Sequence, residues 1–189
     1  MDLLFTKNFT KNTSLTLPDG SLGYEISTPS RKLHTDTTII RRYPPSGGDP
    51  ESIGVIELHS IRTDVCQVHG KDFLPKSDST HNISMTFTSS NGEVYKWRRE
   101  STKAFLDDKS EETVATYEEG HTGLLGGIPR QAKLSISTEA MDIIDEVVCT
   151  FFYIEQKEQT RRRFASNQGM AMDAKTAGAM NSMFAVTPY

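Results

Sequence analysis

The segment from Met141 to Glu158, MDIIDEVVCTFFYIEQKE, constrains the fold of this chain more than any other. Its centre, Val147 to Ile154, has no charged residue, while acidic and mixed-charge residues stand on both sides. A helix that is apolar all round must be enclosed by protein or lipid. Eight helical residues span only about 12 Å, which is far too short for a bilayer. We therefore expect the rest of the protein to enclose this segment.

Two secondary structures fit this apolar run. It is rich in β-branched and aromatic residues, so a fully buried central strand agrees with its periodicity equally well. The charged continuation reaches Arg163 without a turn residue, which favours a helix. Thr138 is a candidate N-cap, and Glu139 and Asp142 would lie in the first turn, where acids suit the helix dipole. We predict a helix over about residues 139–160.

The preceding part of the chain is typical of short strands. TTIIRRY, from Thr37 to Tyr43, is rich in β-branched residues, and IGVIELHS, from Ile53 to Ser60, alternates between two faces. Turn residues separate such stretches, as in Pro18-Asp19-Gly20. Helix-favouring stretches appear only from Thr138 onward. The pattern predicts a mainly β protein.

A hairpin over residues 83–99 has its turn at Asn91-Gly92. A two-residue loop would place the aromatic residues on opposite faces, whereas a three-residue loop with a left-handed Gly92 would place them on one face. Because burial of one face sets the register, we predict the three-residue loop. This register opposes two pairs of core residues, Phe87 with Tyr95 and Met85 with Trp97.

Length and charge limit the class of protein. One domain is the natural count for 189 residues, and we place it at residues 1–163. Residues 164–189 lack a sustained apolar period, so we expect a disordered tail. The formal charge of −4 argues against a nucleic-acid binder. The sequence shows neither a signal peptide nor a membrane span, which predicts a cytoplasmic protein.

The two cysteines, Cys66 and Cys149, stand in the apolar stretches DVCQV and VVCTF. We expect buried free thiols in a reducing compartment, with a disulfide between them as the alternative.

Four stretches follow one another along the chain: GVIELHS (Gly54–Ser60), the pair His69-Gly70 before FLPK, FTSSNGEVYKWR (Phe87–Arg98) and IIDEVVCTFFYIEQ (Ile143–Gln156). In this order they resemble an uncharacterised domain family of mushroom-forming (basidiomycete) fungi that is held to be tubby-like. The match runs from about Asn12 to Arg163. An aromatic residue often occupies the position of Leu58 in that family, and the chain departs from it there.

This resemblance implies a tubby C-terminal-like fold, related to phospholipid-scramblase-like and LURP-one-related proteins. The expected architecture is a closed antiparallel β-barrel of about twelve strands around the hydrophobic helix. Val147, Val148, Phe151 and Phe152 would then lie in the core with the four hairpin residues. The family supplies no catalytic residue.

One set of side chains suggests a metal site. Glu57 and His59 alternate onto one face of a predicted strand, and His69 lies on the next. Two imidazoles and one carboxylate suit Zn²⁺ or Fe²⁺. No HxxxH or CxxC spacing supports this set, and exposed strand faces collect such residues, so we expect no metal and no other cofactor.

Nucleophilic catalysis has little support in the sequence. The chain contains no GxSxG motif, and Cys149 lies inside the apolar run, where a thiol is inert. We therefore expect a protein that is not an enzyme.

Basic residues suggest a site for an anionic lipid headgroup, the kind of ligand that tubby proteins bind. Arg42, Lys96 and Arg98 are its candidate residues. Strand alternation directs Arg41 and Arg42 to opposite faces, so only one of them can join the other two.

Together these observations predict an intracellular binding or scaffold domain without an assigned function. Its partner would be an unknown protein or an anionic lipid headgroup. Association with phospholipid or phosphoinositide is the alternative function, and a metal-dependent hydrolase is the second alternative.

Overall fold

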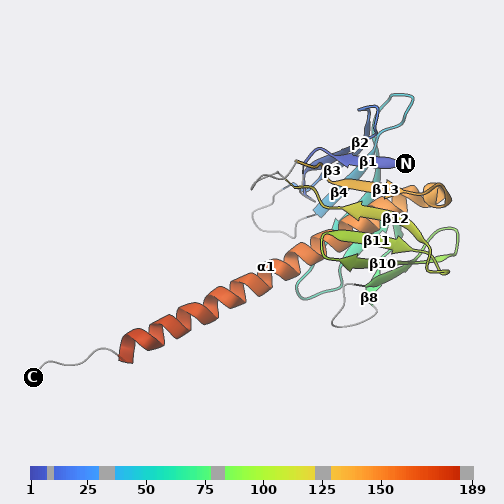
Figure 1. Cartoon of the computed structure of the whole chain (residues 1–189). Helices are drawn as coiled ribbons and strands as arrows, with labels where there is room; N and C mark the ends of the chain where they lie inside the picture. Colours follow the sequence, from blue (N-terminus) through green and yellow to red (C-terminus); the bar gives the residue numbers. More distant parts are fainter. Residues whose placement is uncertain (8–10, 30–36, 78–83, 122–128, 184–189) are drawn as a thin grey trace, which may run out of the picture. The chain divides into compact units, whose positions relative to one another are not determined.

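A computed structural model describes residues 1–7, 11–29, 37–77, 84–121 and 129–183 of the chain (Figure 1). The chain divides into two compact units, Met1–Glu155 and Gln156–Tyr189. The first unit contains the sheet and the hydrophobic core, and the account below concerns that unit unless the second is named.

One antiparallel sheet contains the thirteen strands found in the described part of the chain. From the N-terminus they are β1 (Asp2–Phe5), β2 (Thr13–Thr16), β3 (Leu22–Ser27), β4 (Thr37–Arg42), β5 (Glu51–Glu57), β6 (Val65–Val68), β7 (Lys71–Asp72), β8 (Lys76–Ser77), β9 (Met85–Thr88), β10 (Val94–Glu100), β11 (Lys103–Asp107), β12 (Thr113–Glu118) and β13 (Lys133–Ile136). Their order across the sheet is β7-β6-β5-β4-β3-β2-β1-β13-β12-β11-β10-β9-β8. The protein is mainly β, as its sequence predicts.

The antiparallel sheet agrees with the prediction, but the predicted closure of that sheet into a barrel is wrong. Strands β7 and β8 form the two edges of the sheet and, in the described residues, are not paired with each other. Each has two residues, and Pro75 between them lacks the N–H that a ladder needs. Because only Phe73, Leu74 and Pro75 separate the two strands, chain length alone keeps these edges within about 14 Å of each other. The sheet therefore curls around, but its hydrogen bonding leaves a seam.

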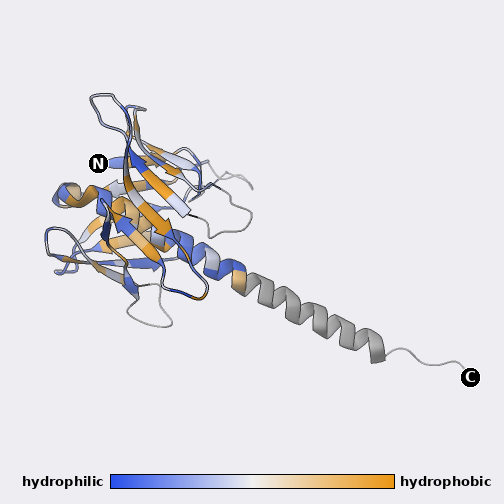
Figure 2. Cartoon of the chain, turned by 180° about the vertical axis from the view of Figure 1, so that it is seen from behind, coloured by the Kyte–Doolittle hydropathy of each residue, from blue (hydrophilic) through white to orange (hydrophobic). Residues whose placement is uncertain are grey.

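Hydrophobic and hydrophilic residues alternate along the strands, so that one face of the sheet is buried (Figure 2). The β9–β10 hairpin has the register predicted from the sequence, with Tyr95 opposite Phe87 and Trp97 opposite Met85. Ser89 donates its backbone N–H to the Glu93 carbonyl at 2.9 Å, which leaves a three-residue loop. Gly92 in that loop has φ 83°, in the left-handed region.

The apolar run of the sequence is helical. A 3₁₀ helix, η1 (Thr138–Ile143), leads directly into α1 (Ile144–Met183). In the first unit, the side chains of Val147, Val148, Phe151 and Phe152 are buried. Helix α1 continues past the end predicted near residue 160, while the predicted domain limit at residue 163 and the role of the tail stay predictions. None of the helices in the described ranges is both long and apolar enough to cross a membrane.

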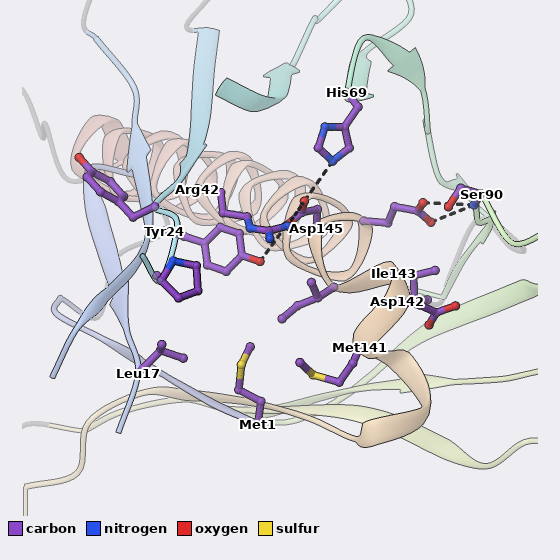
Figure 3. A pocket seen from close by; sticks show the side chains of 15 residues that line it. Met1, Leu17, Tyr24, Arg42, His69, Ser90, Met141, Asp142, Ile143 and Asp145 are labelled. Atoms are coloured by element: carbon purple, nitrogen blue, oxygen red, sulfur yellow. Dashed lines mark hydrogen bonds and ion pairs between the residues drawn. The ribbon is translucent and has the colours of Figure 1, made fainter. Parts of the chain in front are cut away.

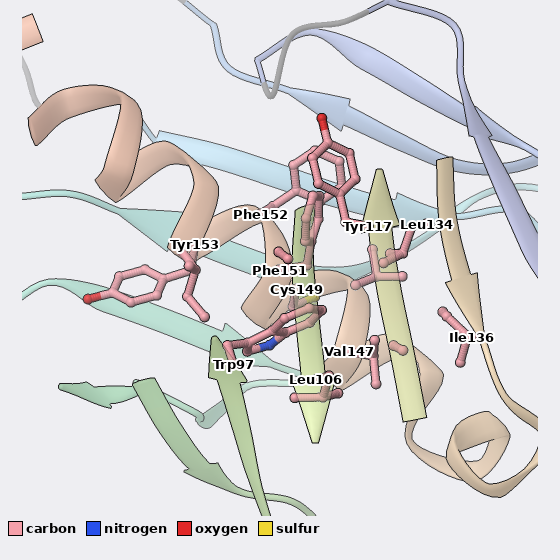
Figure 4. Packing of buried hydrophobic residues seen from close by; sticks show 14 of the residues in the cluster. Trp97, Leu106, Tyr117, Leu134, Ile136, Val147, Cys149, Phe151, Phe152 and Tyr153 are labelled. Carbon is pink, nitrogen blue, oxygen red and sulfur yellow. The ribbon is translucent and has the colours of Figure 1, made fainter. Parts of the chain in front are cut away.

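Strands from distant parts of the sheet contact the buried turns of α1 (Figure 4). The Phe151 ring lies 5.9 Å from that of Phe5 on β1, 5.7 Å from Trp97 on β10 and 4.7 Å from Tyr117 on β12. The indole N–H of Trp97 donates to Thr150 Oγ1 at 3.0 Å, which satisfies its one polar group inside the core. The sheet therefore encloses this part of the helix.

On the other half of the sheet, Gly54 of β5 faces Cys149 of α1. A Cβ atom placed on Gly54 would lie 2.4 Å from Cys149 Sγ, so only glycine permits this approach. Cys66 and Cys149 are both buried free thiols, which confirms that expectation over the disulfide. Burial raises the pKa of the Cys66 thiol to about 12, so the thiol stays protonated and unreactive at neutral pH.

Candidate functional site

A cavity of about 350 Å³ lies at the N-terminal end of α1 (Figure 3). Its walls come from Met1, from β3 and β4, from the turns after β6 and β9, and from η1 with the first turn of α1. This volume is at the small end of the range for ligand sites, roughly 300–1,000 Å³. The cavity can therefore accept a compact molecule.

Asp145, in the first turn of α1, is the polar centre of this wall. Its Oδ1 accepts a hydrogen bond from the Tyr24 hydroxyl at 2.8 Å. Its Oδ2 accepts from Arg42 Nη1 at 2.9 Å and lies 3.0 Å from His69 Nε2. Tyr24 and Arg42 are direct partners in the β3–β4 ladder and point to the same inner face. A carboxylate here also suits the positive end of the helix dipole.

The turn after β6 carries His69 to this carboxylate. Val68 pairs with Lys71, so His69 and Gly70 form a two-residue hairpin loop. Both have positive φ, 48° and 73°, which is the backbone that a type I′ turn needs. Glycine adopts this conformation without cost, and histidine is among the residues that tolerate it best. The His69-Gly70 pair therefore positions an imidazole at the cavity.

Burial and charge set the protonation of the residues around Asp145. Burial, followed by the negative charge of Asp145, raises the pKa of Tyr24 well above its ordinary value. The same carboxylate raises the pKa of Arg42. At neutral pH, Tyr24 is therefore a neutral donor and Arg42 a full cation. The three donors hold Asp145 rigidly although it is almost fully buried.

Glu146 is a second buried carboxylate in the cavity wall, with 5% of its surface exposed. Both of its oxygens lie near one donor, the backbone N–H of Ser90 in the β9–β10 loop, at 3.2 and 3.1 Å. No ion pair joins Glu146 to a cation among the described residues. The exposed Asp142 adds a third carboxylate to the lining.

The remaining lining of the cavity is mostly apolar. Met1, Leu17 and Met141 lie below Tyr24 and Arg42 in Figure 3, and Ile143 adds a further apolar side chain to the lining. The cavity thus has an apolar side and a polar side. This combination suits a ligand with an apolar body and one polar group.

The residues proposed as metal ligands do not come together. His59 Nε2 lies 3.4 Å from Glu57 Oε2 near the end of β5. His69 instead donates its backbone N–H to the Ile53 carbonyl near the start of that strand and directs its ring to Asp145. No group of three or more His, Cys, Asp or Glu residues suited to a metal occurs in the ranges that the structure describes.

The three basic residues proposed for a lipid headgroup also lie apart. Arg42 faces the cavity from β4, whereas Lys96 and Arg98 alternate with the buried Trp97 and so lie on the outer face of β10. Six strands separate β4 from β10 in the sheet. Arg98 is paired with Asp107 and Glu100 and stacks on the Phe105 ring at 4.4 Å.

Sequence reasoning missed most of this cavity. It treated Asp145 and Glu146 only as the charged border of the apolar run, and it gave no role to Tyr24. Asp145 and Glu146 are adjacent acids at a helix start, where one acid would be enough to suit the helix dipole. The second acid was a signal in the sequence that this end of the helix has a further role. The His69-Gly70 dipeptide was a second signal, because a glycine at this position favours a tight hairpin turn.

Comparison with known proteins identifies the family to which the chain belongs. No curated protein and no solved structure matches the chain. A family model described as a family of unknown function, DUF6593, matches residues 8–160, a stretch that contains β2 to β13 and Asp145 with its partners Tyr24, Arg42 and His69. This match covers most of the 189 residues, so the chain belongs to that family of unknown function.

Proposed function

We propose that this chain is a non-enzymatic binding domain and that its binding site is the cavity at the start of α1. The observation that carries this proposal is the Asp145 carboxylate, which is held in the polar wall of a cavity whose opposite wall is apolar. Three donors from three separate segments hold that carboxylate in place. Few, well-placed polar groups in an apolar cavity are typical of ligand sites.

The geometry of the histidine supports binding over catalysis. His69 directs Nε2 to Asp145 at 3.0 Å, and its Nδ1 lies 3.7 Å from Glu51 Oε1. Both ring nitrogens therefore face carboxylates, whereas a general base needs a nitrogen directed at its substrate. Tyr24 is held protonated by burial, so it serves as a donor to Asp145. These groups are arranged to hold one another.

An intracellular location and a tubby-like relation within basidiomycete fungi belong to this proposal. Buried free thiols at Cys66 and Cys149 support a reducing compartment. Enclosure of the first turns of α1 by antiparallel strands supports the tubby-like relation. Neither the lipid-headgroup set nor the metal set is assembled in the described residues, so those two alternatives have no support from geometry.

A fragment screen read by methyl NMR tests the proposed site. The Ile143 and Ile144 methyl groups line the cavity, and the Met85 methyl on β9 reports on a distant part of the core. We expect some members of a mixed library of cationic, neutral and anionic fragments to shift the isoleucine signals and leave Met85 unchanged.

Two tryptophan substitutions provide the matched control. Met141→Trp places a bulky ring in the cavity lining, whereas Ile61→Trp places the same ring at a fully exposed position. The shifts should disappear in the first variant and persist in the second, with melting curves showing that both are folded. The proposal fails if no fragment shifts the isoleucines, or if Met141→Trp leaves the shifts intact.

A further inference from the structure

The geometry points to a small organic cation as the ligand: a primary ammonium group on a compact, largely apolar body. This inference rests on the proposed function, because it names the ligand class of the same cavity. Three features carry it, namely the charge of the lining, the incomplete pairing of Glu146 and the apolar side of the cavity.

Two of the three acidic groups in the lining have no cationic partner among the described residues. Asp142, Asp145 and Glu146 supply three carboxylates, and the basic groups of the lining residues are the Arg42 guanidinium, the His69 imidazole and the α-amino group of Met1. Arg42 and His69 are both directed to Asp145, so they offset that one carboxylate. The Met1 amino group donates to the Ile136 carbonyl, so Asp142 and Glu146 remain without a cationic partner among the described residues, and their charges make the potential around them negative. Such a field favours a cationic ligand.

The amino group of Met1 lies beside this cavity as well. It donates to the backbone carbonyl of Ile136 on β13. The amino group is therefore directed at the sheet, and Glu146 keeps Ser90 as its partner.

Glu146 is the group that lacks a counterpart. A carboxylate accepts about four hydrogen bonds, yet the described contacts give Glu146 one N–H, shared between its two oxygens. Buried carboxylates are ordinarily paired with a cation or fully hydrogen-bonded, because removing a charge from water is costly. A primary ammonium group brings a positive charge and three donors, which is what this site lacks.

The apolar side sets the rest of the ligand. Leu17, Met141 and Ile143 offer aliphatic contact, and methionine sulfur packs favourably against aromatic rings. Tyr43 adds an aromatic ring to the lining, and cations are attracted to such faces. With a cavity of about 350 Å³, a single ring on a short linker is a suitable size. Phenethylammonium is therefore the test ligand.

An anionic ligand meets the opposite conditions. It would compete with Asp145 for Arg42 and His69, whose hydrogen bonds hold that buried carboxylate in place. It would also face the charges of Glu146 and Asp142. Phenylacetate, which has a similar body and a carboxylate, should therefore bind worst.

The test compares phenethylammonium, phenylacetate and phenethyl alcohol by calorimetric and methyl-NMR titration of the full chain. We expect the ammonium compound to bind at least tenfold more tightly than the other two, and less tightly as salt is raised. Glu146→Gln keeps the acceptor for Ser90 and removes the charge, so it should weaken ammonium binding at least fivefold and leave alcohol binding unchanged. Glu139→Gln, an exposed acid of η1 outside the lining, changes the net charge equally and should have no effect.

Each outcome separates the ligand class from the site. If the alcohol or phenylacetate binds as well as the amine and Met141→Trp abolishes that binding, the class is wrong and the cavity remains the binding site. If the amine binds equally well to Met141→Trp, both proposals are wrong. If none of the three compounds binds, the class is refuted, and the fragment screen alone decides the proposed function. If Glu146→Gln does not fold, Asp142→Asn at an exposed position replaces it, with a smaller expected loss of amine affinity.

Discussion

Replacing Gly54 with alanine tests how closely α1 packs on the sheet. The new Cβ would lie 2.4 Å from Cys149 Sγ and 3.3 Å from Ile40 Cβ. Non-bonded carbon atoms pack best at about 3.5–4.0 Å, so β5 and α1 must separate by about 1 Å or Cys149 must rotate. Gly54 is not among the residues with positive φ, so the effect of the substitution is steric.

The expected cost follows from these contacts. Overpacking a core costs about 1–3 kcal/mol, and the gain from a less flexible unfolded chain returns about 0.4–1 kcal/mol. We therefore expect Gly54→Ala to lower the free energy of unfolding by about 1–2 kcal/mol. Cys149→Ala removes one buried sulfur and should also cost about 1–2 kcal/mol. In the double variant, the alanine at position 54 meets the Cβ at position 149 at 3.6 Å, an ordinary contact that partly fills the void.

The two substitutions should therefore be coupled. We expect the double variant to be about 1–2 kcal/mol more stable than the sum of the single losses. Urea denaturation of the four proteins, followed by the fluorescence of the buried Trp97, measures each free energy and its denaturant slope. Losses that add within about 0.5 kcal/mol, or a neutral Gly54→Ala, would refute the contact between β5 and α1.

Three further predictions concern the core and the tail. Phe151→Ala should cost about 3–5 kcal/mol in urea melts because its buried ring packs against four other aromatic rings, and a loss below about 1 kcal/mol would rule enclosure out. Burial raises the pKa of Cys66 to about 12 from an ordinary 9.0. The stability linked to this shift is fully present below pH 9 and is lost as the pH rises toward 12. The free energy of unfolding should thus fall by about 1 kcal/mol more between pH 9 and pH 10 in the wild type than in Cys66→Ala, and equal slopes would contradict this. Truncation after Arg163 should leave the thermal midpoint unchanged, since the described hydrophobic core ends at Ile154; a drop of many degrees would mean that the tail docks.

The parts of the fold that the sequence predicted are those with local signals. The run from Val147 to Ile154 is too apolar for any exposed element, so burial of the helix follows from eight consecutive residues. The β9–β10 register follows from Asn91-Gly92 together with the requirement that Phe87, Tyr95 and Trp97 share one face. In both cases the determining residues are close together in the sequence.

Closure of the sheet had no such signal. The strands at its edges, β7 and β8, have two residues each, which is too few to show any periodicity. The closed barrel came from resemblance, and the outcome depended on Phe73, Leu74 and Pro75, which separate the edges without pairing them. The sequence shows that Pro75 cannot donate a hydrogen bond to a strand ladder, but it does not show that Pro75 lies between the two edge strands.

The candidate site was hidden because its members are far apart in the sequence. Tyr24, Arg42 and His69 are 121, 103 and 76 residues from Asp145. Only the order of the strands brings them to one carboxylate, and no spacing rule connects them. His69 was considered as a metal ligand with His59, but the β5–β6 register places the two histidines at opposite ends of the same hairpin.

The two ends of the enclosed helical segment give the strongest reason to place a ligand at the first of them. An enclosed helix needs partners for its terminal polar groups and for the charged residues that border it. At the far end, Glu155 is paired with Arg99, and both side chains are 6% exposed. At the near end, Asp145 is equally well satisfied, but Glu146 meets one backbone N–H and a cavity. If these acids served only to start and enclose the helix, both ends should be closed in the same way. A cationic molecule bound to Glu146 would account for this difference between the two ends of the helical segment.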